Sequence, residues 1–412
     1  MLRSTLTIIA RLLTGANSLF TGVLLFVCAL HTAHAAEATA SIDTTALRQL
    51  GRSLFFDPSL SASGVQSCAT CHDPRYAYGP PPGKAIAFGG RDMHSGGTRA
   101  VPSLRYLQTL RPFEEKHQFG DGDLEPYGGF TWDGRSASAR EQAQLPLLAA
   151  NEMANANAAA VVEKLRRAPY AAEFRRVFGA DVFAQPQHAF DSALRALEAF
   201  QQTPSEFFPF TSKYDAFLRG ETRLSAQELR GLQLFQDPAK GNCSACHPSE
   251  VHNGAHPVFS DYDFINVGVP RNPQIAANAD PAYYDLGLCG PERTDFADSK
   301  EYCGFFRAPT LRNSALRDAF FHNGALHSLR AMMEFYVQRD TNPEKWYARA
   351  KDGSVQMFDD LPPQYRETIS REKPFDRKPG DAPALSDAEI DDVIAFLQTL
   401  TDGYGAMQDA QR

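Results

Sequence analysis

The chain has 412 residues, of which 43% are hydrophobic and 22% are charged. This composition is typical of a globular protein long enough for about two domains. The formal net charge of −8 argues against nucleic acid as a partner, because a polyanion is repelled by an acidic surface. Such a surface would steer a basic protein partner toward the molecule, or serve solubility alone.

The first 35 residues differ in composition from the rest. Arg3 and Arg11 precede an apolar run at 18–30, which leads into Ala33-His34-Ala35. This order is typical of a cleaved secretory signal peptide. The alternative is an uncleaved anchor, but a run of about 13 residues is short for a membrane-spanning helix, which needs about 20. The sequence therefore predicts an exported chain with no membrane segment after cleavage and a formal charge of −10.

One eight-residue unit occurs twice in the chain. Gly51-Arg-Ser-Leu-Phe-Phe-Asp-Pro58 recurs 180 residues later as Gly231-Leu-Gln-Leu-Phe-Gln-Asp-Pro238. Each copy leads into a CxxCH motif, Cys68-Ala-Thr-Cys71-His72 in the first case and Cys243-Ser-Ala-Cys246-His247 in the second. The repeat predicts two versions of one structural unit.

The pattern between these motifs is helical, and no comparable run of strict alternation occurs. Apolar residues recur on one helix face between 190 and 200 (Phe190, Ala193, Leu194, Leu197 and Phe200). Ser386-Asp-Ala-Glu389 is a capping box that begins the last helix, with Leu385 and Ile390 placed as a hydrophobic staple and an end expected near Leu400. The Gly- and Pro-rich stretches 78–97 and 343–383 are predicted to be loops that cover a site.

The predicted domain organisation follows from the repeat. We expect a signal peptide at 1–35, an N-terminal domain at 36–205 and a C-terminal domain at 206–412, with a mainly α fold class.

Each CxxCH motif carries the residues that attach a c-type haem. The two thiols form thioether bonds to the haem vinyl groups, and the histidine that follows can bind the iron from one side. A dithiol redox pair lacks its βαβ context here, and a zinc site would not need a histidine after both motifs. Two copies in an exported chain predict two covalently attached haems, with His72 and His247 as iron ligands.

Two further cysteines are predicted to pair. Of the seven cysteines, Cys28 leaves with the predicted signal peptide and four belong to the CxxCH motifs. Cys289 and Cys303 enclose a short segment of an exported chain, so we expect a disulfide that contributes about 3 kcal/mol by loop closure. Two free thiols are the alternative.

Other motifs resemble the di-haem cytochrome c peroxidase and MauG family over nearly the whole predicted mature chain. They occur in the family's order: Phe130-Thr-Trp132-Asp-Gly-Arg135, Glu141-Gln142-Ala143, Pro146, Asn151-Glu152-Met153, Ala308-Pro-Thr-Leu-Arg-Asn313 and Phe321-His-Asn-Gly324. The resemblance implies two cytochrome c-like domains, each with one covalently bound haem, packed around an interface between the haems. It also implies a periplasmic enzyme that reduces hydrogen peroxide to water.

The resemblance assigns roles in the N-terminal domain, whose haem would be the peroxidatic one with His72 as ligand. Glu152 stands twenty residues after Trp132, the family's spacing, and would take a proton from hydrogen peroxide and return it to the leaving oxygen. Gln142 and Pro146 would shape this pocket. Trp132 would lie between the haems and relay electrons. Taken alone, Glu152 could be an ion-paired surface residue and Trp132 a core residue.

The resemblance also addresses the second ligand of the C-terminal haem, which His247 would hold on one side. Tyr336 stands fourteen residues after His322, where MauG has a tyrosine and other bacterial peroxidases a methionine. A phenolate favours ferric or higher iron, whereas a thioether raises the reduction potential. Met332 lies one turn earlier on the same helix face and is the runner-up ligand.

Three positions depart from the family pattern. Arg99-Ala-Val-Pro102 lacks the asparagine expected to bind calcium, and the carbonyls expected to complete that site map to Arg317 and Ala319, which leaves the family's calcium ion in doubt. Gly241 stands where MauG has the tryptophan that passes oxidising equivalents to its protein substrate, so maturation of methylamine dehydrogenase is not expected. His94 is a poor match to the loop histidine that covers the peroxidatic iron, so we expect no obligatory reductive activation.

Two other functions remain open. A MauG-like enzyme would oxidise a partner protein through a high-valent state shared by the two haems, instead of accepting electrons from a small redox protein. A non-enzymatic di-haem electron carrier would need no acid-base residue, and the spacing of Glu152 argues against it. The sequence specifies neither the electron donor nor the oligomeric state.

Overall fold

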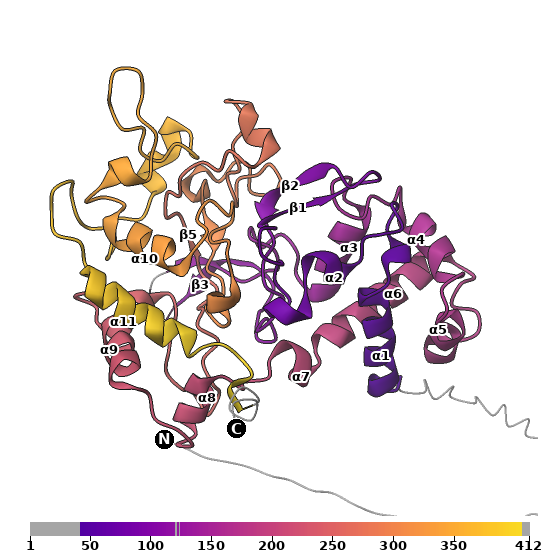
Figure 1. Ribbon diagram of the computed structural model, residues 1–412. Helices are drawn as coiled ribbons and strands as arrows, with labels where there is room; N and C mark the ends of the chain where they lie inside the picture. The colour runs from indigo at the N-terminus through magenta and orange to yellow at the C-terminus, as the bar shows by residue number, and fades with distance from the viewer. Residues whose placement is uncertain (1–41, 120–121, 123, 406–412) are drawn as a thin grey trace, which may run out of the picture. The chain divides into compact units, whose positions relative to one another are not determined.

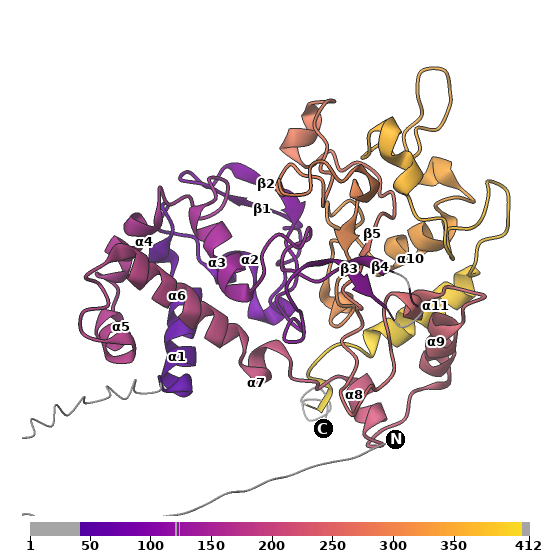
Figure 2. The ribbon, with the colours of Figure 1, turned by 180° about the vertical axis from the view of Figure 1, so that it is seen from behind.

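The computed structural model describes residues 42–119, 122 and 124–405. The predicted signal peptide at 1–35 lies outside the described residues. The described chain is mostly helical (Figures 1 and 2). Its longer helices are α1 (Thr44–Phe55), α3 (Ala139–Leu148), α4 (Ala158–Leu165), α5 (Ala171–Phe178), α6 (Pro186–Gln201), α8 (Lys213–Leu218), α9 (Ala226–Gln236), α10 (Leu329–Gln338) and α11 (Asp387–Gln398), and its shortest are α2 (Cys68–Cys71) and α7 (Pro204–Phe207).

None of the helices in this described part is both long and apolar enough to cross a membrane. The predicted helices are found where the patterns place them. The five apolar residues from Phe190 to Phe200 are all buried on α6. Ser386 caps α11 in a capping box with Glu389, and Leu385 and Ile390 are both buried. These predictions are confirmed. They could be made from the sequence because capping and a 3.6-residue apolar period are local signals.

The described residues also form three small antiparallel sheets, each of two strands. They pair β1 (Ile86–Gly89) with β2 (Ser95–Ala100), β3 (Glu114–Gln118) with β4 (Leu124–Tyr127), and β5 (Phe264–Ile265) with β6 (Phe306–Arg307). The prediction of a loop at 78–97 is therefore wrong in part. The strands are too short, and Ser95-Gly-Gly too poor in side chains, for alternation to be read. The stretch 343–383 is irregular apart from 3₁₀ turns, as predicted.

The two repeated glycines serve the same purpose in each half of the chain, where α1 crosses α6 and α9 crosses α11 (Figures 1 and 2). A Cβ atom added to Gly51 would lie 1.9 Å from the Ala196 carbonyl oxygen, and one added to Gly231 would lie 1.9 Å from the Asp392 carbonyl oxygen. Each glycine thus lets one helix rest directly on the backbone of the other. The sequence repeat is therefore a repeat of one helix crossing.

We expect Gly51→Ala and Gly231→Ala each to destabilise the protein by about 1–3 kcal/mol, because the added methyl group forces the crossing helices apart. Gly96→Ala is the matched control, since its Cβ would lie 3.5 Å from the Phe88 ring, an ordinary contact. Thermal unfolding of the three purified variants beside wild type checks this. An unfolding midpoint of Gly51→Ala or Gly231→Ala equal to that of wild type would contradict the close contact between the crossing helices.

The buried apolar side chains form two large clusters. One is drawn from residues 47–207 and combines α1, α3, α4 and α6, and the other is drawn from residues 214–400 and combines α9, α10 and α11. Phe55 meets Phe200 edge to face at 5.4 Å in the first cluster, and Phe235 meets Phe396 in the same manner at 5.2 Å in the second. The two halves thus share their core packing as well as their helix crossing.

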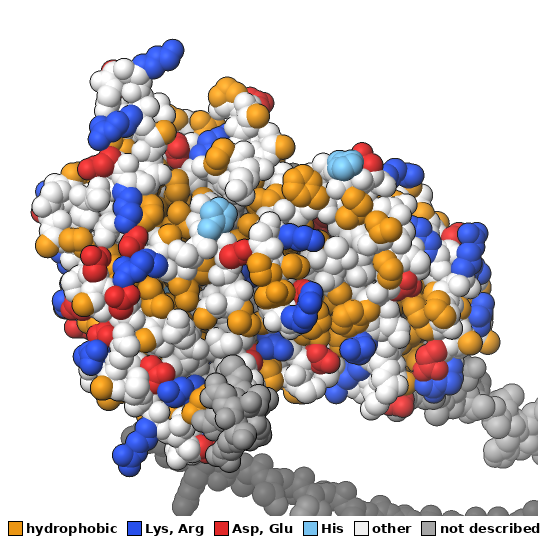
Figure 3. Space-filling model, in the orientation of Figure 1, with side chains coloured by type: hydrophobic (Ala, Val, Ile, Leu, Met, Phe, Trp, Pro, Cys, Tyr) orange, Lys and Arg blue, Asp and Glu red, His pale blue; other side chains and the backbone are white. Residues whose placement is uncertain are grey.

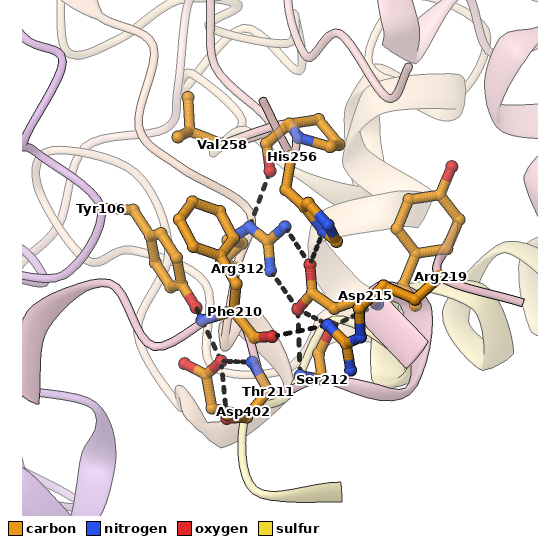
Figure 4. A network of polar contacts seen from close by, with 12 residues as sticks. Tyr106, Phe210, Thr211, Ser212, Asp215, Arg219, His256, Val258, Arg312 and Asp402 are labelled. Atoms are coloured by element: carbon orange, nitrogen blue, oxygen red, sulfur yellow. Dashed lines mark hydrogen bonds and ion pairs between the residues drawn. The ribbon is translucent and has the colours of Figure 1, made fainter. Parts of the chain in front are cut away.

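A buried ion pair organises the second half (Figure 4). Arg312 and Asp215 are joined by two hydrogen bonds of 2.9 and 2.8 Å, and both side chains are shielded completely from solvent. His256 contacts the same carboxylate at 2.7 Å. Although burial opposes it, hydrogen bonding and charge from Arg312 lower the pKa of Asp215 to about 2.

Cys289 and Cys303 form a disulfide with a Cα–Cα distance of 5.0 Å, within the usual range. The predicted pairing is confirmed. The bond closes the segment that carries Glu292 and Arg293, and Arg293 reaches across to donate a hydrogen bond of 2.9 Å to the Asp133 carbonyl oxygen. The cross-link therefore stabilises a segment that contacts the residue after Trp132.

Candidate active site

The histidines of the two CxxCH motifs are held in the same manner. His72 Nδ1 lies 3.0 Å from the Tyr78 carbonyl oxygen, and His247 Nδ1 lies 2.8 Å from the Phe259 carbonyl oxygen. When Nδ1–H donates to a carbonyl oxygen, the lone pair of Nε2 is free to bind a metal, the arrangement common for metal-binding histidines. Burial lowers the pKa of both imidazoles to about 4, so they are neutral near pH 7, as iron ligation requires.

The cysteines of these motifs are free of disulfide bonds. Burial raises the pKa of Cys68 and of Cys243 to about 12, the opposite of the acidic thiol of a redox motif. Among the described residues no group of three or more His, Cys, Asp or Glu side chains is placed to hold a metal ion. The weakly acidic thiols therefore fit covalently attached haem better than a dithiol redox pair.

A cavity surrounds the second motif. Cys243, Cys246 and His247 line it together with Met332, Met333 and Tyr336 of α10. The Tyr336 ring stacks on Phe375 at 5.5 Å. Burial and the neighbouring thiols raise the pKa of Tyr336 above its ordinary value of 10. Because Tyr336 and Met332 both reach this cavity, the choice between them as iron ligand stays a prediction.

Trp132 stands at the border of the same cavity and is buried. Its indole Nε1–H donates to the Ala100 carbonyl oxygen at 2.8 Å, and its own carbonyl oxygen accepts from the Arg307 N–H at 2.9 Å. The ring is thus fixed by β2 of the first half and the backbone by β6 of the second. This is the position that a residue linking two redox groups would need, but a core role is compatible with the same contacts.

Sequence reasoning missed an ionic cluster that supports Trp132. Arg99 contacts Asp133 and Asp285 at 2.6 Å each, and both carboxylates are buried. Although burial opposes it, the charges of Arg99 and Arg135 lower the pKa of Asp133 to about 2. Asp285 lies 186 residues from Arg99, so no local pattern could reveal the cluster.

Glu152 is placed by a tight backbone arrangement. Gly90 N–H donates to the Glu152 carbonyl oxygen at 2.7 Å, and Met153 N–H donates to the Pro146 carbonyl oxygen at 3.0 Å. A Cβ atom on Gly89 would lie 2.8 Å from the Glu152 Cα. The end of β1 thus lies against the Glu152 backbone, which only glycine permits.

The Glu152 carboxylate lies close to the first CxxCH motif. Its charge contributes to the raised pKa of both Cys68 and Cys71. The side chain is exposed in the polypeptide, yet the surrounding protein removes enough hydration from the carboxylate to raise its pKa above the usual 4.5, with Arg135 opposing. An exposed, partly dehydrated carboxylate suits proton transfer better than an ion-paired surface role.

Gln142 and Pro146 are half-buried on α3, four residues apart. Pro146 has no N–H, so the Gln142 carbonyl oxygen lacks its normal helix partner. No described contact joins the Gln142 side chain to Glu152, and its role in the pocket stays a prediction. His94 is exposed at the β1–β2 turn.

Known proteins resemble this chain closely. The sequence model of the family described as di-haem cytochrome c peroxidase matches residues 45–223. The methylamine utilization protein MauG of Paracoccus denitrificans is 35% identical over 366 residues, which are 87% of this chain and 89% of that protein. The cytochrome c551 peroxidase of Pseudomonas aeruginosa is 30% identical over 286 residues, which are 69% of each chain.

A solved structure is similar to this chain over most of its length. The diheme peroxidase BthA from Burkholderia thailandensis superposes with a TM-score of 0.79 at 35% identity, over 88% of this chain and 89% of that one. Such neighbours imply two cytochrome c domains. With its two CxxCH motifs in equivalent settings, the chain belongs to the di-haem cytochrome c peroxidase and MauG family of di-haem peroxidase oxidoreductases.

Proposed function

We propose that this protein is a periplasmic di-haem peroxidase that reduces hydrogen peroxide to water with two electrons and two protons. The observation that carries the proposal is Glu152, whose backbone is fixed against Gly89 and Gly90 and whose carboxylate acts electrostatically on Cys68 and Cys71. An electron carrier needs no titratable group at this place. The disulfide fits an exported protein.

Two c-type haems are the cofactors in this proposal. Cys68, Cys71 and His72 would hold one in an N-terminal domain at 36–205, and Cys243, Cys246 and His247 the other in a C-terminal domain at 206–412. The two separate apolar clusters support this division. When bound, the haems supply the iron redox chemistry that breaks the peroxide bond.

The chain's own residues handle protons and electrons. In its ionised form, Glu152 would accept a proton from one oxygen of hydrogen peroxide and deliver it to the other, which leaves as water. Gln142 and Pro146 would bound the space available to peroxide. Trp132, held by Ala100 and Arg307, would carry electrons from the C-terminal haem site to the N-terminal one.

A second candidate function is oxidation of a partner protein, favoured by the similarity to MauG. Gly241 argues against the same exit route, because glycine has no aromatic ring that could pass an oxidising equivalent to a partner. On the face shown in Figure 3, acidic and basic side chains are interspersed, so no single-sign patch there selects a donor.

Steady-state turnover distinguishes the two functions. We expect rapid oxidation of a reduced small cytochrome c by hydrogen peroxide, without prior reduction of the enzyme and with loss of activity in Glu152→Gln. Peroxide-dependent oxidation of a co-expressed partner protein, with no cytochrome c turnover, would instead favour the second function.

We expect Tyr336→Met to raise the reduction potential of the C-terminal haem, because a thioether replaces a phenolate that stabilises ferric iron. Met332→Leu is the matched control, since Met332 lines the same cavity one turn away. Potentiometric titration followed by optical absorption checks both. If Met332→Leu shifts the potential and Tyr336→Met does not, Met332 is the ligand.

A further inference from the structure

The Arg317 guanidinium binds one of the carbonyl oxygens, that of Ala319, which the family resemblance gives to a calcium ion. Its Nη2–H donates to the Val101 carbonyl oxygen at 2.9 Å, and its Nε–H donates to the Ala319 carbonyl oxygen at 3.2 Å. Val101 belongs to the Arg99–Pro102 run in which calcium-binding asparagine is replaced, here by Ala100. The residues therefore do not fit calcium, because lone pairs that a cation would use already accept hydrogen bonds from a guanidinium.

The guanidinium also lies near both haem sites. Its Nη1 is 3.1 Å from the place where a Cβ on Gly79 would stand, directly after Tyr78, whose carbonyl oxygen holds His72. Burial has the largest effect on the pKa of His72 and lowers it, and the hydrogen bond to Tyr78 raises it. The charge of Arg317 has the third largest effect and lowers it. Arg317 also lines the cavity that His247 and Trp132 line.

Within the described part of the chain, the guanidinium of Arg317 donates its hydrogen bonds to backbone carbonyl oxygens and not to a carboxylate. The adjacent Asp318 carboxylate, which accepts a hydrogen bond from the Gly83 N–H, offsets part of the Arg317 charge and raises the pKa of Arg317. Burial lowers the pKa of Arg317 only to about 10, so the side chain stays positive at neutral pH. A divalent ion placed on the same carbonyl oxygens would be repelled by a full unit charge at close range.

We propose that Arg317 is the permanent cation between the two haem sites and takes the place of a divalent metal ion there. A fixed positive charge near both irons favours their reduced states and so raises both reduction potentials. Unlike an exchangeable ion, an arginine keeps this charge whatever the calcium concentration. The inference rests on the two haem sites of the proposed function and not on its peroxide chemistry.

The test is made on haem-loaded protein without peroxide. The first part measures calcium by mass spectrometry after gel filtration, and records optical and electron paramagnetic resonance spectra before and after treatment with the chelator EGTA. We expect far less than one calcium ion per chain and unchanged spectra. One retained calcium ion per chain, whose removal alters the haem spectra, would overturn the proposal.

The second part compares Arg317→Gln and Arg317→Lys with wild type by potentiometric titration. The potentials of both haems should fall in Arg317→Gln and return toward wild type in Arg317→Lys, which keeps the charge. Arg349→Gln is the control, because this exposed arginine also donates to a carbonyl, that of Gly353, and should change neither potential. Unchanged potentials in Arg317→Gln would refute the charge's role. If Arg317→Gln does not load haem, the proposal is tested by the potentials of Arg317→Lys, which should stay near those of wild type, and by the calcium content of wild type.

Discussion

Replacement of Glu152 by glutamine should lower kcat/KM for hydrogen peroxide by about 10²- to 10⁴-fold, the usual contribution of a general acid-base residue. Glutamine keeps the size and polarity of the side chain but can neither accept nor release the proton. Because the Glu152 backbone is fixed by Gly90 and by its approach to Gly89, the substitution should leave the surrounding structure and the haem spectra unchanged.

The pH profile gives this prediction a signature that a structural role would lack. The base must be ionised, and its pKa is raised above the usual 4.5. Wild-type kcat/KM should therefore fall as the pH drops through this raised pKa, whereas Glu152→Gln should be slow at every pH without that limb. Glu141→Gln, an exposed glutamate on α3, is the matched control. Equal activity of both variants would contradict the assignment.

Replacement of Arg312 by methionine should destabilise the protein by about 3–5 kcal/mol, because it leaves the Asp215 charge buried and unpaired. The two side chains share two hydrogen bonds and are hidden from solvent. Arg312 also lines the cavity of the second CxxCH motif, so haem loading of the C-terminal site should fall as well. Urea unfolding of the haem-loaded protein measures the loss.

Arg219→Met is the control for this prediction. Arg219 belongs to the same polar network (Figure 4), but its ion pair with Glu221 is exposed, and exposed pairs contribute little. A loss in Arg312→Met no larger than that in Arg219→Met would show that the buried pair is not a determinant of stability. A double variant that also replaces Asp215 by leucine should recover part of the loss, since it removes the unpaired charge.

Local patterns predicted much of the fold. The caps and apolar faces of α6 and α11 were predicted correctly because each depends on residues within a few turns. The repeated Gly51 and Gly231 units predicted two versions of one structural unit, which the structure shows to be two equivalent helix crossings. The β1–β2 hairpin was missed because its strands are short and rich in glycine, and it is held by contacts from outside, such as the Gly90 bond to Glu152.

The candidate site divides in a similar way. The haem-attachment residues follow from a contiguous motif, and Glu152 and Tyr336 follow from spacing within a family. The clusters around Arg99 and Arg317 could not be predicted from spacing, since Arg99 contacts Asp285 and Arg317 contacts Val101 from distant parts of the chain. The sequence raised doubt about calcium but could not reveal that a guanidinium binds the Ala319 carbonyl oxygen, one of those expected to complete the calcium site.

The proposed function requires that Glu152 acts on peroxide at one of two inequivalent haem sites. The most direct measurement is the electron paramagnetic resonance spectrum of the oxidised, haem-loaded protein before and after one equivalent of hydrogen peroxide, in wild type and in Glu152→Gln. We predict one high-spin and one low-spin ferric signal, both lost rapidly with peroxide in wild type and slowly in the variant. Two low-spin signals that peroxide leaves unchanged, even after partial reduction, would contradict the claim and indicate an electron carrier.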